Sequence, residues 1–298
     1  MKELENLVSK ELPVKGKVQP VKLGLDDTIQ FHCHKGIACF NKCCQNIDIT
    51  LTPYDIIRLK NRLGMTSREF LDKYTIPYEM DPHGMPGVKF KPVEGDTACR
   101  FVTEEGCSVY EDRPTACRYY ALGLMSMRRK DSASDEDSYF LVTEDHCLGH
   151  KEERRLTVRE YRQEQGLDEY DEYGHDWRRI ILKKRSAGPT VGAPAPQTFQ
   201  LFWIASYELE EFRKFVLSEA FQDAYDLEPD YVRQLENDEI ELMKFANRFM
   251  RQVFFKEESI PLKPDAIEKR KASQKRRAEA RRAKVRQEAA KEKDSPVT

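Results

Sequence analysis

The sequence contains no long hydrophobic run. Its longest apolar patch, residues 199–206, is far too short for a bilayer, which a helix crosses with about 20 apolar residues. The first residues interleave charges with a few apolar side chains and so lack the continuous apolar segment of a secretory signal. We therefore expect a cytoplasmic protein with no membrane partner, in a reducing compartment where thiols are not held in disulfides.

The common catalytic fingerprints are also missing. No G-x-S-x-G, P-loop, Rossmann or H-E-x-x-H motif occurs. Carboxylates are abundant, but spacing alone assigns catalysis to no pair, so the catalytic residues, if there are any, stay unknown. A composition of 39% hydrophobic and 34% charged residues is typical of a globular domain with a heavily charged surface.

Charge is unevenly distributed along the chain. Residues 265–298 hold six Lys and six Arg against six acidic residues, a net charge of +6. Because the whole chain has a net charge of −2, residues 1–264 have a net charge of −8. The tail 264–298 has almost no apolar stripe and no aromatic residue, so we expect it to be solvated, either disordered or helical. We expect no nucleic-acid partner except through this tail, where interspersed acids and the lack of aromatic residues weaken such binding.

All eight cysteines lie between positions 33 and 147, and none follows. Any one of them alone could be a buried small hydrophobe, and a redox thiol relay is a further alternative. A clustered set in a reducing compartment instead predicts metal ligation, because thiolates are soft ligands that select zinc, copper(I) and iron–sulfur clusters. The predicted ligands are Cys33, Cys39, Cys43, Cys44, Cys99, Cys107, Cys117 and Cys147.

The first four cysteines have the spacing C-x5-C-x3-C-C, which matches neither a zinc ribbon nor a bacterial ferredoxin. A disulfide between Cys43 and Cys44 would be strained, because neighbouring Cα atoms lie about 3.8 Å apart. In extended backbone the two side chains would point to opposite faces. The pair therefore favours two nearby metals or two irons of one cluster, so the expected cofactor is an iron–sulfur cluster or zinc, with iron–sulfur slightly favoured.

Charged and imidazole side chains flank several of these cysteines. Arg113 and Arg118 bracket Cys117, and nearby cations lower the pKa of a thiol. Alternatively, Arg113 pairs with a neighbouring acid at position 111 or 112. His34 and His146 could supply nitrogen ligands or donate hydrogen bonds to sulfur, or they could be ordinary surface histidines.

Helix signals follow the first cysteines. Thr52 is a good N-cap, Pro53 fits the first helical position, and Gly64 can end the helix in a left-handed conformation. Thr66 and Glu69 form a possible capping box for the next helix. Turn residues 104–106 predict a hairpin between 99–102 and 107–110, further strands are expected at 121–128 and 138–143, and helices at 157–165 and 168–184.

The C-terminal half reads as mainly helical. Residues 186–196 have the composition of a linker, Ser206 is expected to cap a helix, and Asn237 to cap the clearest one. The latter carries an apolar stripe that we interpret as core: Leu242, Phe245, Ala246, Phe249, Met250 and Val253. We predict an α+β fold with an arm (1–30), a cysteine-rich core with short hairpins and flanking helices (31–185), a linker (186–198), a helical region packing on the first domain (199–263) and the tail (264–298).

The segments FHCHKGIACFNKCC, LTPYDIIRLKNRLG, CRFV at 99–102 and CSVYEDRPTACRYY resemble the YkgJ-type cysteine-cluster family, a zinc- or iron-chelating domain. The resemblance is clearest over residues 31–120. It implies metal or iron–sulfur binding in a bacterial cytoplasmic protein, and a related branch is linked to lysine methylation of flagellin. The function hypotheses are thus a metal-binding protein, a metal-dependent transferase or redox enzyme, or a protein that delivers metal to an unknown client.

Overall fold

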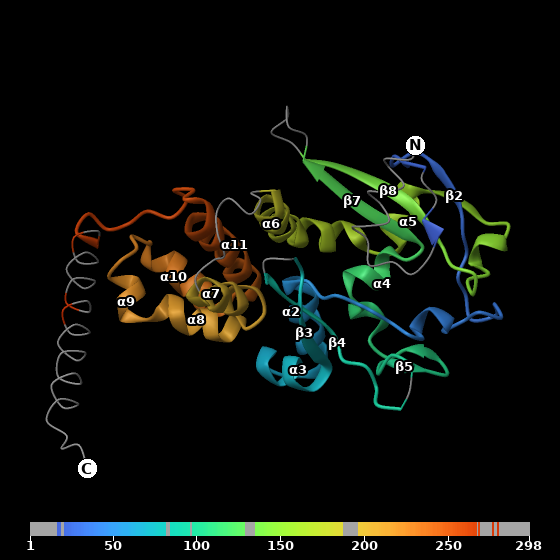
Figure 1. Cartoon of the computed structure of the whole chain (residues 1–298), viewed down its shortest axis with the longest axis horizontal. Coiled ribbons are helices and arrows are strands. Elements are labelled where there is room, and N and C mark those ends of the chain that lie inside the picture. The colour runs from blue at the N-terminus through green and yellow to red at the C-terminus, as the bar shows by residue number, and fades with distance from the viewer. Residues whose placement is uncertain are drawn as a thin grey trace, which may run out of the picture. The chain divides into compact units, whose positions relative to one another are not determined.

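The computed structural model describes residues 17–18, 21–81, 84–95, 97–128, 135–186, 196–266, 268, 276 and 279. It contains two compact units, Met1–Glu210 and Glu211–Thr298. Short antiparallel strands and helices build the first unit and helices build the second, which confirms the predicted α+β class (Figure 1). The predicted domain boundaries stay predictions, because residues 187–195 of the linker and most of the tail lie outside the described residues.

The strands of the first unit form small antiparallel sheets with the orders β1-β8-β7, β2-β9, β3-β4 and β5-β6. The structure therefore adds two short strands to the segment that we interpret as an arm. Figure 1 shows β7 and β8 side by side as a long hairpin. The bounds are β1 Lys17–Val18, β2 Thr28–Gln30, β3 Thr75–Glu79, β4 Pro86–Phe90, β5 Val102–Thr103, β6 Gly106–Cys107, β7 Leu122–Arg128, β8 Asp135–Thr143 and β9 Arg155–Thr157.

The predicted hairpin at 99–110 and the strands at 121–128 and 138–143 are confirmed by β5, β6, β7 and β8, and the two predicted helices after residue 157 are α5 and α6. Helices α7 and α10 were not predicted from the sequence. The helices are η1 Lys42–Cys44, α2 Pro53–Leu63, α3 Ser67–Tyr74, η2 Tyr110–Asp112, α4 Thr115–Tyr119, η3 Gly149–Lys151, α5 Val158–Glu164, α6 Leu167–Ser186, α7 Pro196–Ser206, α8 Leu209–Leu217, α9 Glu219–Gln222, α10 Pro229–Asn237 and α11 Glu239–Phe255.

Helices α2 and α3 begin where the sequence predicts. The Thr52 hydroxyl accepts from the Asp55 N–H (3.2 Å), and the Asp55 carboxylate accepts from the Thr52 N–H (2.8 Å), which completes a capping box. Gly64 ends α2 with φ of 63°, a left-handed conformation that glycine adopts without steric cost. Thr66 and Glu69 repeat the box on α3.

One hydrophobic cluster joins the segments that carry Cys33, Cys117 and Cys147 in the first unit. Phe31 lies two residues before Cys33, Tyr119 lies two residues after Cys117, and Cys147 itself packs against the cluster. Burial of these side chains fixes the backbone next to the thiols. The buried members are Ile29, Phe31, Tyr119, Ala121, Leu122, Tyr139, Leu156, Val158, Tyr161 and Leu167.

The second unit confirms the apolar stripe of α11 as core, except for Val253, which is 40% exposed. Phe245 and Phe249 contact Phe212 and Phe221 from α8 and α9. The helix begins one residue later than expected, because Asp238 and not Asn237 is the N-cap.

The predicted cap at Ser206 is wrong, because this residue ends α7 and its hydroxyl accepts from Trp177 Nε1 (3.1 Å). Among the described helices, none is both long enough and apolar enough to traverse a membrane.

Candidate metal centre

All eight cysteines line a single cavity of about 1660 Å³ in the first unit. They are free thiols; Cys33 and Cys43 are exposed, and the other six are partly buried. Arg113, His34 and His146 line the same cavity. Residues that lie up to 114 positions apart in the sequence, Cys33 and Cys147, thus face one space.

Cys33, Cys39 and Cys147 form what we call the first cysteine set. The His32 N–H donates to the Gly149 carbonyl (3.0 Å), which holds the segment of Cys33 against the turn of Cys147. The Leu148 N–H donates to the Cys39 sulfur (3.2 Å), so Cys39 lies against the same turn. Burial, together with the negative charges of nearby thiolates, raises the pKa of Cys33 to about 11.

Cys44, Cys99, Cys107 and Cys117 form the second cysteine set. The Cys99 N–H donates to the Cys44 carbonyl (2.7 Å), and Cys107 pairs with Val102 across the β5–β6 hairpin. Burial raises the pKa of Cys99. The N–H groups of Phe101 and Val102 donate to its sulfur and offset part of this rise. Burial also raises the pKa values of Cys107 and Cys117, and Val109 N–H partly offsets this at Cys107.

The expectation that Cys43 and Cys44 point to opposite faces is wrong, because the backbone there is not extended. Residues Lys42–Cys44 form the 3₁₀ turn η1, in which successive side chains are separated by about 120° because one turn takes 3.0 residues. The two thiols are hydrogen-bonded to each other, which lowers the pKa of Cys43 to about 7 and raises that of Cys44. The pair can thus reach two neighbouring positions in the cavity.

The two arginines beside Cys117 do not lower its pKa, because burial of this thiol outweighs their charge. At Cys107, the charge of Arg113 offsets part of the rise in pKa that burial causes. Arg113 donates to the Tyr110 carbonyl (2.6 Å) and to Gln165 Oε1 (2.7 Å), while Asp112, its suggested alternative partner, pairs with Arg58 (2.7 Å).

Arg118 holds the backbone around Cys117. Its guanidinium donates to the carbonyls of Arg113 (3.1 Å) and Gln165 (2.7 Å), to the Glu111 carbonyl and to the Tyr170 hydroxyl (3.1 Å). Three separate segments are therefore joined through one buried side chain.

Asp55 is part of the site but was not predicted from the sequence. Its carboxylate accepts from both the N–H and the hydroxyl of Thr115 (2.7 Å each), at the first turn of α4, which carries Cys117. Burial raises the pKa of Asp55, while these donors lower it. The Thr52 capping signal marks Asp55 as a helix residue, but no local signal reveals a partner 60 residues away.

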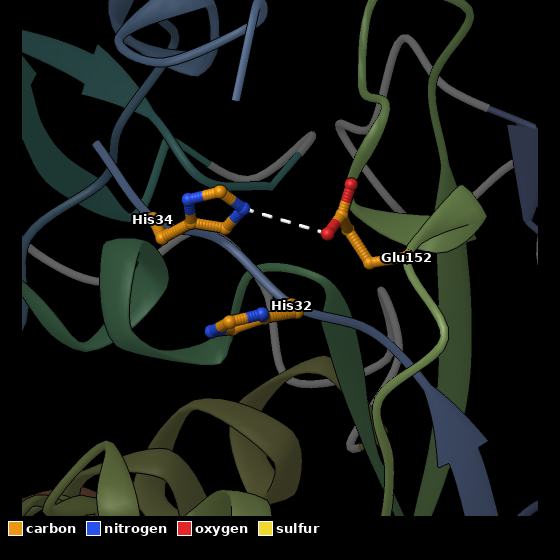
Figure 2. Close-up of side chains that lie close together, drawn as sticks. All are labelled: His32, His34 and Glu152. Atoms are coloured by element: carbon orange, nitrogen blue, oxygen red, sulfur yellow. Dashed lines mark ion pairs between the residues drawn. The ribbon is translucent and has the colours of Figure 1, made fainter. Parts of the chain in front are cut away.

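The two histidines that we expected beside the ligands pair with carboxylates. His146 Nε2 lies 3.5 Å from Glu144, and His34 Nε2 lies 3.4 Å from Glu152. Figure 2 shows His34 pointing at Glu152, with His32 beside it. Within the part of the chain that the structure describes, these three residues are the one group whose potential ligand atoms all lie within 4.8 Å of one another.

That group is not poised to bind a metal through His34 Nε2. The Gly36 N–H donates to His34 Nδ1 (3.1 Å), so the ring proton is on Nε2 and faces Glu152. A metal at Nε2 needs that nitrogen unprotonated, with the proton moved to Nδ1, where it would oppose the Gly36 N–H.

The cysteine donor set, by contrast, fits zinc or iron. Thiolates ligate both zinc and the irons of iron–sulfur clusters, and N–H donors to the sulfurs of Cys99 and Cys107 favour the ionised form that ligates. Within the described residues, no three cysteine sulfurs lie within 4.8 Å of one another. Ligation of a single ion by several thiols therefore requires their sulfurs to come closer together, through rotation of the side chains or movement of the loops.

A small α+β unit with eight thiols around one cavity defines the class of cysteine-rich metal-chelating domains. Residues 32–173 match the model of the CxxCxxCC family, described as "Putative zinc- or iron-chelating domain". Metal binding is thus supported for the domain, without distinction between zinc and iron. Comparisons with curated proteins and with solved structures give no significant match.

Replacement of Gly149 by alanine is expected to destabilise the protein by about 2 kcal/mol through overpacking. A Cβ at this position would lie 2.7 Å from a ring carbon of Phe31 and 3.1 Å from the His32 carbonyl oxygen, which would force the Cys33 segment away from the Cys147 turn. Gly123→Ala is the control, because its nearest neighbour would be at 3.4 Å. Equal urea unfolding midpoints for the two variants would contradict the prediction.

Proposed function

We propose that this domain ligates an iron–sulfur cluster through its clustered cysteines, with zinc as the alternative metal. The observation that carries the proposal is the convergence of all eight thiols on one cavity. Neither calcium nor magnesium would select such a set, because both prefer oxygen ligands.

Two features favour iron–sulfur over zinc. Adjacent Cys43 and Cys44 suit a multinuclear centre, in which neighbouring thiolates bind different metal atoms, better than one tetrahedral ion. Backbone N–H groups also donate to several of the sulfurs, and such hydrogen bonds are one of the means by which proteins tune cluster potentials.

Purification of the full chain without air, followed by measurement of bound metal, inorganic sulfide and the visible spectrum, tests this proposal. We expect a brown protein with iron and sulfide in equal amounts. Colourless protein with stoichiometric zinc and no sulfide would overturn the iron–sulfur form and leave zinc as the metal.

Serine substitutions test the site itself. Cys107→Ser together with Cys117→Ser should reduce the metal content, because both thiols line the cavity. Ser108→Ala is the matched control: it lies next to Cys107, and its hydroxyl donates to the Phe101 carbonyl (3.0 Å). Unchanged metal in the double cysteine variant would show that the site is assigned wrongly.

A further inference from the structure

Tyr120 lies beside the turn that carries Cys147. It comes just before β7, and the Val142 N–H near the end of β8 donates to the Ala121 carbonyl (2.9 Å), which continues the pairing of the two strands. After β8, the Cys147 N–H donates to the Glu144 carbonyl (2.9 Å) and closes a turn. Antiparallel pairing therefore sets Tyr120 against the start of this turn.

The side chain of Tyr120 reaches the same space as the Cys147 thiol. Tyr120, Glu144 and Cys147 all line the cavity. Tyr120 and Cys147 also pack against the same hydrophobic cluster. The Tyr161 hydroxyl donates to the Tyr120 carbonyl, which ties the backbone of Tyr120 to α5. The tyrosine is thus held in the cavity wall next to Cys147.

The hydroxyl oxygen of Tyr120 is buried, and with the residues that the structure describes it completes no hydrogen bond. A buried hydroxyl without a partner is costly, so folded proteins seldom keep one. Two acceptors lie close enough to act on it: after burial, Cys147 and then Glu144 raise the pKa of Tyr120. The hydroxyl is therefore a donor that faces a cysteine sulfur and a carboxylate.

Ligation changes the strength of that sulfur as an acceptor. A neutral thiol accepts hydrogen bonds only weakly, whereas an ionised acceptor forms shorter and stronger ones. A sulfur that binds a metal is a thiolate, so metal binding would supply the acceptor that the Tyr120 hydroxyl needs.

We propose, building on the proposed function, that Tyr120 is a positioning residue of the metal centre, whose hydroxyl donates a hydrogen bond to the Cys147 sulfur when that sulfur ligates the metal. The hydrogen bond fixes the direction of the sulfur and stabilises its negative charge. Partners that hydrogen-bond to metal ligands in this way contribute to metal affinity although they do not touch the metal.

Replacement of Tyr120 by phenylalanine removes the hydroxyl and keeps the ring. We expect the zinc affinity of the full chain to fall by about 10-fold, measured by competition with a chromophoric chelator under argon. Tyr207→Phe is the matched control, because it also removes one hydroxyl from a buried tyrosine of the first unit, and that hydroxyl donates to the Pro86 carbonyl (3.3 Å).

Equal zinc affinities of the Tyr120→Phe and Tyr207→Phe chains would overturn the proposal and leave the proposed function standing. A wild-type chain that takes up no iron, sulfide or zinc would overturn the proposed function itself.

Unfolding by urea, with and without zinc, distinguishes positioning from a purely structural role. Tyr120→Phe removes a buried hydroxyl that completes no hydrogen bond with a described residue, so the unfolding midpoint of the metal-free chain should equal that of the wild type or exceed it. With zinc bound, the midpoint should lie below that of the wild type, because the ligating sulfur loses its donor. Equal decreases in both states would show a structural role only and contradict the proposal.

A double variant identifies the acceptor. Glu144→Gln keeps the size of the side chain and removes its charge. If the hydroxyl donates to Cys147, Tyr120→Phe should lower the zinc affinity by a similar factor in this background and in the wild type. Loss of the effect would assign the hydrogen bond to Glu144 and refute the proposal. Far-UV circular dichroism identifies a variant that does not fold, and the comparison with Tyr207→Phe decides without Glu144→Gln.

Discussion

Replacement of Asp55 by alanine is expected to lower the free energy of unfolding by about 3 kcal/mol, because it leaves buried donors without an acceptor. Asp55 is fully buried, and Thr115 is buried beside it. One carboxylate oxygen accepts two hydrogen bonds from Thr115, and the other accepts from Thr52. The substitution therefore removes both the capping box of α2 and the link from α2 to α4.

The same substitution should reduce metal content, since α4 positions Cys117 in the cavity. Asp55→Asn separates the capping of α2 from the link between α2 and α4. An amide has one oxygen and one NH₂ group, so it can accept from either Thr115 or Thr52 but opposes the other donor. We expect its stability to lie between those of the wild type and the alanine variant.

Glu69→Ala is the matched control, because Glu69 closes the same type of capping box on α3 but is exposed, and among the described residues its carboxylate accepts from Thr66. Urea unfolding followed by circular dichroism, with an unchanged m-value, gives the free energies. A loss at Asp55 no larger than that at Glu69 would refute the role of Asp55 as the link to α4.

Elements with local signals in the sequence were predictable. Thr52, Pro53 and Gly64 gave the bounds of α2, and Thr66 with Glu69 gave the start of α3. These signals act between residues a few positions apart, so one sequence contains all the information needed. Helix α10 was missed because its apolar residues are few, and only Leu235 is buried.

Contacts between distant segments were not predictable in this way. Clustering of the cysteines in the sequence indicated a metal site, but it could not show which thiols share a wall of the cavity. The expected orientation of Cys43 and Cys44 failed because it assumed extended backbone where the chain forms a 3₁₀ turn. Similarly, Arg118 was chosen for its charge, and the structure shows a role in bonding to carbonyls.

Arg118→Ala is expected to have an effect at least as large as that of Asp55→Ala, about 3 to 4 kcal/mol, because it leaves several acceptors without a donor. The carbonyls of Arg113 and Gln165 and the hydroxyl of Tyr170 each lose a partner. The guanidinium also lies over the Tyr170 ring, 4.1 Å from its centroid, a contact that alanine removes. Because Cys117 is the adjacent residue, the loss of these Arg118 contacts should also displace Cys117 from its position in the cavity.

Arg118→Lys distinguishes charge from geometry. Lysine keeps the positive charge but has no planar fork, so it can satisfy only part of this set of acceptors. If Arg118 acts by positioning Cys117, the lysine variant should lose most of the stability that the alanine variant loses, and its zinc affinity should fall by about 10- to 100-fold.

Arg233→Ala is the control, because Arg233 is an exposed arginine that pairs with Asp230 on the surface of α10. We expect this substitution to change neither the free energy of unfolding nor the zinc affinity. Wild-type zinc affinity in Arg118→Lys would show that only the charge of Arg118 matters. That result would contradict a positioning role, since these three carbonyls, from the segments of residues 111–113 and 165, can be joined only by a side chain with several donors in one plane.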